Sequence, residues 1–135
     1  MVKVIMGLKG SGKTKKLIEL IKEAETAENG NVVCIERKPQ LTYDIPYSVR
    51  LIAASDYNLV SYDVLKGFIS GLHAGNYDIT NVYIDNLYKT IGVDRAAGEE
   101  FILWCAEFAK TNNMEITVTV SDDPALASEE IKKFL

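Results

Sequence analysis

The chain has few cysteines, few prolines and no long apolar run. Its 135 residues contain two cysteines, three prolines and one histidine. Cys34 and Cys105 lack the CxxC spacing of zinc and redox sites, so we expect two buried free thiols. No apolar stretch approaches the length that a membrane span or the core of a secretory signal requires. These absences predict a cytoplasmic protein with no membrane segment.

An excess of positive charge is also missing. The 15 lysines and arginines are outnumbered by 19 aspartates and glutamates, which gives a formal net charge of −4. This balance argues against a dedicated nucleic-acid surface. The seven tyrosines are scattered and do not interleave with basic residues as they would in a single-strand-binding platform. We therefore expect no nucleic-acid partner, and the length fits a single domain over residues 1–135.

The most informative motif lies close to the start of the chain. Residues 7–14 read Gly-Leu-Lys-Gly-Ser-Gly-Lys-Thr, a full match to the phosphate-binding pattern GxxxxGK followed by Ser or Thr. Its glycines permit a turn in which successive main-chain N–H groups point at the α and β phosphates of a nucleotide. Lys13 is expected to reach the β and γ phosphates, and the Thr14 hydroxyl to bind Mg²⁺. The nucleotide-binding residues that this motif predicts are Gly7, Lys9, Gly10, Ser11, Gly12, Lys13 and Thr14.

Strand and helix patterns alternate along the chain. Residues 2–6 form an apolar run before the motif, and apolar residues recur at helical spacing from Lys13 onward. The same reasoning predicts strands at 31–36, 49–53, 82–84 and 116–120, helices from about 61 and 128, and a helix carrying Phe101, Trp104, Cys105 and Phe108. The alternation predicts an α/β fold of three layers, with a mostly parallel sheet of about five strands flanked by helices.

Polar residues follow three of the predicted strands. They are Glu36, Asp85 and Ser121. In open parallel sheets, ligands bind beyond the carboxyl ends of the strands. Since the glycine motif also follows a strand, we expect one crevice to hold these three side chains together with the phosphate loop.

The motif, Asp85 and the alternating pattern together resemble the P-loop nucleoside triphosphatase superfamily. The resemblance implies that Asp85 holds Mg²⁺ together with Thr14, directly or through a water. Glu36 resembles the water-activating glutamate that the RecA-like branch carries at the end of its second strand, which makes it the candidate general base. Ser121 resembles the polar sensor of the γ phosphate. The chain departs from many of these ATPases at Asn86, where they carry a catalytic glutamate.

A narrower resemblance covers residues 2–18 and the pair Ile84-Asp85. These segments resemble short, stand-alone ATP-binding proteins of bacteria that sometimes bear a twitching-motility ATPase label. The pilus-retraction motors of that name have an additional N-terminal domain and His-rich and Asp-rich boxes. None of these is visible in the sequence, so the motor function is not carried over.

The sequence leaves three functions open. No Asn/Thr-Lys-x-Asp base-reading motif is present, so ATP is favoured over GTP, and we expect a protein that binds ATP and Mg²⁺ and hydrolyses ATP slowly. The first alternative is a non-hydrolysing switch or adaptor module. The second is a small-molecule kinase, for which only Arg37, Arg50 and Arg95 could neutralise the transferred group. Activity in a homo-oligomer or with a protein partner also stays open.

Residues 40–48 form a candidate recognition loop that follows Pro39 and contains Pro46. Their tyrosines, Tyr43 and Tyr47, could stack on adenine. We expect instead that both rings pack into the core, since aromatic rings are more often buried than exposed.

Overall fold

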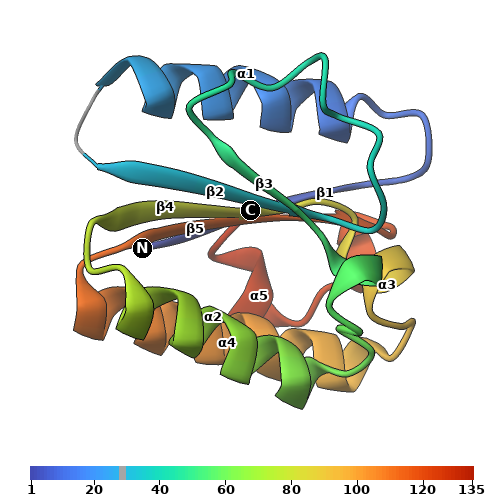
Figure 1. Cartoon of the computed structure of the whole chain (residues 1–135). Helices are drawn as coiled ribbons and strands as arrows, with labels where there is room; N and C mark the ends of the chain where they lie inside the picture. Colours follow the sequence, from blue (N-terminus) through green and yellow to red (C-terminus); the bar gives the residue numbers. More distant parts are fainter. Residues whose placement is uncertain (28–29) are drawn as a thin grey trace.

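The computed structural model describes residues 1–27 and 30–135, and Figure 1 shows a sheet between two layers of helices. The strands are β1 (Val2–Gly7), β2 (Asn31–Glu36), β3 (Arg50–Ala53), β4 (Ile79–Ile84) and β5 (Glu115–Ser121). They lie in the order β1-β5-β4-β2-β3, and every pairing is parallel. The predicted three-layer α/β fold is confirmed, and its sheet is parallel throughout the described residues rather than mostly so.

The helices are divided between the two faces of the sheet. They are α1 (Lys13–Ala27), α2 (Tyr62–Gly75), α3 (Leu87–Thr90), α4 (Arg95–Asn112) and α5 (Glu129–Lys132), with short 3-10 helices at Ala54–Asp56 and Pro124–Leu126. Helix α1 covers one face, and α2 and α4 lie side by side on the other (Figure 1). Side chains fix the starts of these two, because Ser61 accepts a hydrogen bond from Val64 N and Asp94 accepts one from Ala97 N.

The alternation of side chains along each strand separates the core into two parts. Val33, Ile35, Ile84 and Val118 pack with α2 and α4, whereas Cys34 and Tyr83 pack with Leu17 and Ile21 of α1. Because residues two apart share a face of a strand, Glu36 and Asp85 face α1 with Cys34 and Tyr83. Thr117 and Thr119 of β5 lie on that same face, opposite Val118. The α1 side of the sheet therefore carries the polar residues at the carboxyl ends of β2, β4 and β5.

Three details differ from the sequence-based expectations. Strand β4 begins at Ile79, before the predicted residue 82, and the single-turn helix α3 was not predicted because one turn is too short to show a periodic pattern. The expectation that Tyr43 and Tyr47 pack into the core is wrong, since both side chains are fully exposed. The loop that carries them is held by its aliphatic residues, Leu41 and Ile45, which are buried against α1.

Bilayer-spanning helices are not found in the part of the chain that the structure describes. None of the helices there combines the length and the apolar character that a crossing requires.

Candidate functional site

The predicted phosphate loop connects the edge strand β1 to α1. Gly10 and Gly12 both have φ of +86°, a conformation that residues with a Cβ rarely adopt. A Cβ on Gly7 would lie 2.5 Å from Ser11 Oγ, so the Ser11 side chain would have to move to admit a larger residue. The backbone of this turn therefore requires glycine at Gly10 and Gly12, whereas Gly7 leaves room for a side chain once Ser11 has moved.

Main-chain donors gather where the loop meets α1. The first helical hydrogen bond runs from Lys16 N to Gly12 O, at 3.0 Å. The N–H groups of Lys13, Thr14 and Lys15 precede that bond and have no carbonyl one turn earlier to accept them. They lie at the positive end of the helix dipole. The ammonium of Lys13 adds a full charge, and its Nζ donates back over the loop to Leu8 O at 3.1 Å.

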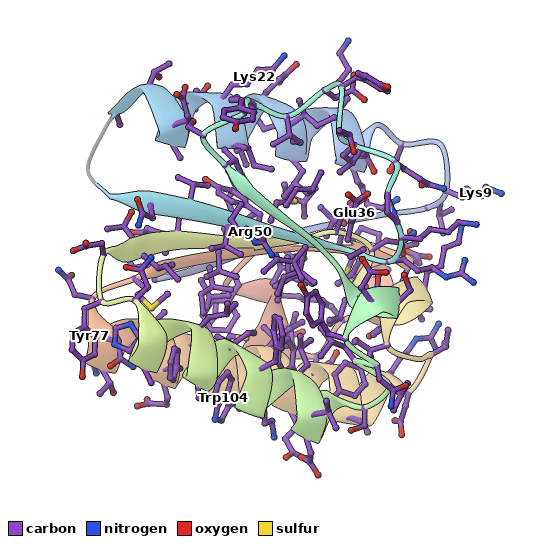
Figure 2. All side chains as sticks on the ribbon, viewed as in Figure 1. Lys9, Lys22, Glu36, Arg50, Tyr77 and Trp104 are labelled. Atoms are coloured by element: carbon purple, nitrogen blue, oxygen red, sulfur yellow. The ribbon has the colours of Figure 1, made fainter. Side chains whose placement is uncertain are left out.

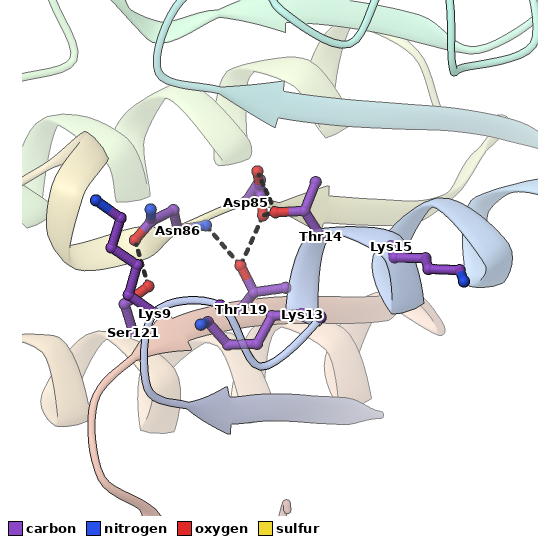
Figure 3. Close-up of a pocket in the computed structure, with 10 residues that line it drawn as sticks. Lys9, Lys13, Thr14, Lys15, Asp85, Asn86, Thr119 and Ser121 are labelled. Carbon is purple, nitrogen blue, oxygen red and sulfur yellow. Dashed lines mark hydrogen bonds between the residues drawn. The ribbon is translucent and has the colours of Figure 1, made fainter.

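Asp85 is held by two hydroxyl groups at the base of this loop (Figure 3). Thr14 Oγ1 lies 3.3 Å from Asp85 Oδ1 and 3.4 Å from Oδ2. Thr119 Oγ1 donates to Asp85 Oδ1 at 2.8 Å and accepts from Asn86 N at 2.6 Å. Because its single hydrogen goes to the carboxylate, the Thr119 hydroxyl must offer a lone pair to the amide. Thr119 thus fixes both the carboxylate and the chain direction that follows it.

Asn86 and Ser121 close the other side of the same cluster. Asn86 lies in the left-handed region, with φ of 51° and ψ of 64°, where a residue other than glycine costs conformational energy. Ser121 Oγ donates to Asn86 Oδ1 at 3.2 Å (Figure 3). The residue that follows Asp85 is therefore an amide that bonds across to β5.

These residues surround a hollow of about 360 Å³ at the carboxyl end of the sheet. Its lining includes Lys9, Gly10, Gly12, Lys13, Thr14, Lys15, Asp85, Asn86, Thr119 and Ser121 (Figure 3). The cationic loop and the carboxylate face each other across this space, and its volume lies within the usual range of small-molecule sites. The structure thus brings together Asp85, Ser121 and most of the motif, but it does not bring Glu36 into this hollow.

Glu36 lies on the far side of Asp85, at the end of the neighbouring strand. Ile35 pairs with Ile84, so Glu36 and Asp85 are the next residues along β2 and β4. The Glu36 side chain is 3% exposed; its Oε1 accepts from Gln40 N at 2.9 Å and from Leu41 N at 3.2 Å. Its Oε2 is buried and has no hydrogen-bond partner among the described residues. One carboxylate oxygen of Glu36 therefore holds the loop that follows β2, while the other has no hydrogen-bond partner among the described residues.

The surroundings of Glu36 make its carboxylate a stronger base than that of an ordinary glutamate. Burial is the main cause that raises the pKa of the Glu36 carboxyl above its ordinary value, and the nearby Asp85 raises it further. The two main-chain hydrogen bonds oppose this increase only in part. A small hollow of about 50 Å³ adjoins Glu36 and shares Asp85 and Asn86 with the larger one. Figure 2 shows Glu36 and Lys9 toward the same end of the molecule, with Tyr77 at the other.

Other titratable residues contribute differently. Arg95 Nη2 donates to Asp122 Oδ1 at 2.9 Å, and this arginine lowers the pKa of Asp122. Cys34 and Cys105 are buried, which raises the pKa of both thiols. Across residues 1–27 and 30–135, no three His, Cys, Asp or Glu side chains converge as a metal site. A cation near Asp85 and the Thr14 hydroxyl would thus take its remaining ligands from the oxygens of a bound nucleotide and from water.

Sequence reasoning missed Thr119. The available signal was its position: Thr117, Thr119 and Ser121 alternate with Ile116, Val118 and Val120, which puts three hydroxyl groups on one face of an otherwise apolar strand. Such a row on a buried strand indicates hydrogen-bond partners across the sheet, because buried hydroxyls are rarely left unpaired.

Comparison with known proteins supplies no family assignment. No protein-family model matches the sequence, and a search of curated proteins finds no significantly similar one.

Proposed function

We propose that the chain binds Mg·ATP in the hollow beside the phosphate loop and hydrolyses it slowly. The observation that carries the proposal is the convergence of the loop's unpaired N–H groups and Lys13 with the Thr14–Asp85 contact. Polyphosphate needs many donors at close range, and these donors require no rearrangement of the main chain. ATP is proposed over GTP because the guanine-reading motif is missing from the sequence.

The donor set at Asp85 fits Mg²⁺. A carboxylate and a threonine hydroxyl are hard oxygen ligands, and this ion commonly takes one or two such groups and completes its shell with phosphate oxygens and water. When bound, it would neutralise charge on the β and γ phosphates. Thr119 keeps Asp85 oriented while Thr14 and Lys13 turn toward the ligand, and Ser121 would lie near the γ phosphate.

Glu36 supplies the proposed base for hydrolysis. Glu36 lines the 50 Å³ hollow, which is large enough for a water, since one water occupies at least about 10–15 Å³ of such space. A water there would donate a proton to Oε2 as its oxygen attacks the γ phosphorus, while the bond from that phosphorus to the β–γ bridging oxygen breaks and ADP leaves. We expect turnover to be slow because, among the described residues, no arginine lines the larger hollow to stabilise the transferred group.

Thermal unfolding with and without Mg·ATP tests the binding. A ligand at a hundredfold excess over its Kd adds about 2.7 kcal/mol, which should raise Tm by several degrees. Lys13→Ala should abolish the increase, whereas Lys22→Ala, which removes an exposed lysine from the body of α1, should retain it. An equal increase in both variants, or none in the wild type at millimolar nucleotide, would refute nucleotide binding at the loop.

A switch without hydrolysis is the second candidate, and one observation favours it. Glu36 Oε1 already anchors the loop after β2 through Gln40 and Leu41. If a bound nucleotide drew the Glu36 side chain away, these two hydrogen bonds would change. The position of the loop, and with it the exposed tyrosines, would then depend on the nucleotide. The switch is favoured over the hydrolase if the wild type binds Mg·ATP tightly but releases no more phosphate than the Glu36→Gln variant does.

A further inference from the structure

The hollow beside the phosphate loop is the first of three that follow the carboxyl ends of the strands. The second, of about 50 Å³, shares Asp85 and Asn86 with the first. The third, of about 170 Å³, shares Arg37 and Thr90 with the second and extends to the loop after β3. Three adjoining hollows therefore follow one another from the phosphate loop past Glu36 to Arg37, and we call this row the groove.

Glu36 stands at the narrow middle of this groove. Its Oε1 is committed to the main chain, but its buried Oε2 has no partner among the described residues. A buried carboxylate oxygen without a donor is costly and uncommon in folded proteins. A ligand hydroxyl in the groove would provide the missing hydrogen bond.

Cations surround the part of the groove beyond Glu36. Arg37, Lys38 and Lys89 line the second hollow, and Arg37 continues into the third. None of the ion pairs formed within residues 1–27 and 30–135 includes any of the three. Asp85, the other acid in this region, faces Thr14 and the phosphate loop. The far end of the groove is thus suited to an anion.

The third hollow, of about 170 Å³, has room for a small anion. A cavity of roughly 150 Å³ holds a benzene ring, so this one admits a compound of roughly six to ten non-hydrogen atoms. Ser55 and Asn58 add hydrogen-bonding groups to its lining, and Val60 adds an apolar wall.

We infer that the groove beyond Glu36 binds a phosphoryl acceptor: a small carboxylate or phosphate monoester that carries a hydroxyl group. This inference rests on the proposed function and names its second substrate. The anionic group would pair with Arg37, which offers two parallel donors to such a group. The acceptor hydroxyl would donate to Glu36 Oε2 on the side nearer to the nucleotide.

Transfer then needs no further reactant. The acceptor oxygen bonds to the γ phosphorus, and the bond from that phosphorus to the oxygen bridging the β and γ phosphates breaks. The acceptor proton moves to Glu36 Oε2, and ADP leaves with the electron pair of the broken bond. Slow hydrolysis is the same reaction with water in place of the acceptor.

The test incubates the full chain and Mg·ATP with glycerate, malate, mevalonate or glycerol 3-phosphate, and with neutral glycerol as the matched control. Phosphorus NMR detects a new phosphate ester, and ADP is measured in parallel. We expect at least one of the acidic compounds to give ester and ADP in equal amounts, and glycerol to give none. Arg37→Ala should raise the acceptor KM about tenfold or more, because the loss of even one of the two charge-assisted hydrogen bonds has an effect of that size, whereas Lys22→Ala should not.

The outcomes separate this inference from the function on which it rests. If Mg·ATP raises Tm and Lys13→Ala abolishes the increase, but no acidic compound yields an ester, the acceptor site is refuted and nucleotide binding stands. An ester formed with the same KM by Arg37→Ala and Lys22→Ala would also refute this site. If Mg·ATP does not bind at all, the proposed function fails and the acceptor site fails with it.

Discussion

Thr119 is the residue on which the geometry around Asp85 most depends. Its hydroxyl is fully buried, donates to Asp85 Oδ1 at 2.8 Å and accepts from Asn86 N at 2.6 Å. Thr119→Val replaces this hydroxyl by a methyl group of nearly the same shape. The substitution therefore removes two hydrogen bonds without leaving a cavity.

The expected loss of stability follows from those two bonds. A hydrogen bond to a charged group contributes about 1.5–3 kcal/mol, and an unsatisfied buried N–H costs about 1–3 kcal/mol. The new methyl group offsets part of this through burial, by roughly 1 kcal/mol. We expect a net destabilisation of about 2–4 kcal/mol, which corresponds to a fall in Tm of roughly 10 °C for a domain of this size.

Urea unfolding measures the effect, and the same strand provides the control. Thr117 precedes Thr119 by two residues, faces the same side and is also buried, but its hydroxyl takes part in none of the site's hydrogen bonds. Thr117→Val should be close to neutral. Thr119→Ser retains the hydroxyl and should recover most of the loss. If the two valine variants are equally stable, the assignment of the Asp85 geometry to Thr119 is wrong.

Three further predictions concern stability and reactivity. Because the pKa of Glu36 is raised, its contribution is complete below the ordinary carboxyl value of about 4.3 and is lost as pH rises through the folded-state pKa. Urea unfolding between acid and neutral pH should show Glu36→Gln gaining stability relative to wild type as pH rises. If the difference in free energy of unfolding between the two proteins does not change with pH, a raised pKa of Glu36 is contradicted. Neither Cys34 nor Cys105 should react with a thiol reagent before unfolding, since both are buried and hard to ionise, and a thiol that reacts rapidly in the native protein would refute their burial. Gly67→Ala should raise Tm, because alanine stabilises an exposed helical site by about 0.5–1 kcal/mol relative to glycine. Gly98→Ala should lower Tm, because the new Cβ would lie 2.6 Å from a tyrosine ring carbon. Changes in Tm of the same sign in both variants would contradict this reasoning.

The sequence predicted the order and type of the long elements because their patterns are local. The apolar runs before residue 7 and at 31–36 are bounded by glycine or polar residues, and each became a strand. Strand order was beyond such reasoning. The residues of β1 do not indicate that this strand pairs with β5 or that it lies at the edge of the sheet. That pairing depends on contacts between segments far apart in the chain.

Some residues of the candidate site could likewise be predicted from local patterns, and others could not. The glycine motif carries its geometry in consecutive residues, so Lys13 and Thr14 could be proposed directly. Asp85 could be proposed because it ends a strand. The role of Thr119 required the sheet register, and the two separate oxygens of Glu36 required the path of the loop that returns to it. Side chains that act through tertiary contacts have no short pattern to predict them.

The place of β1 in the sheet has a consequence for how the protein is made. Among the described residues its only strand neighbour is β5, with Val2 paired to Ile116. During synthesis the glycine motif leaves the ribosome well before β5, so β1 has no strand partner until β5 has followed. Pairing over so long a separation is slow, because the entropy of closing the loop is lost before the contacts form. A fragment that stops before β5 would carry every residue of the motif and lack the strand that supports it.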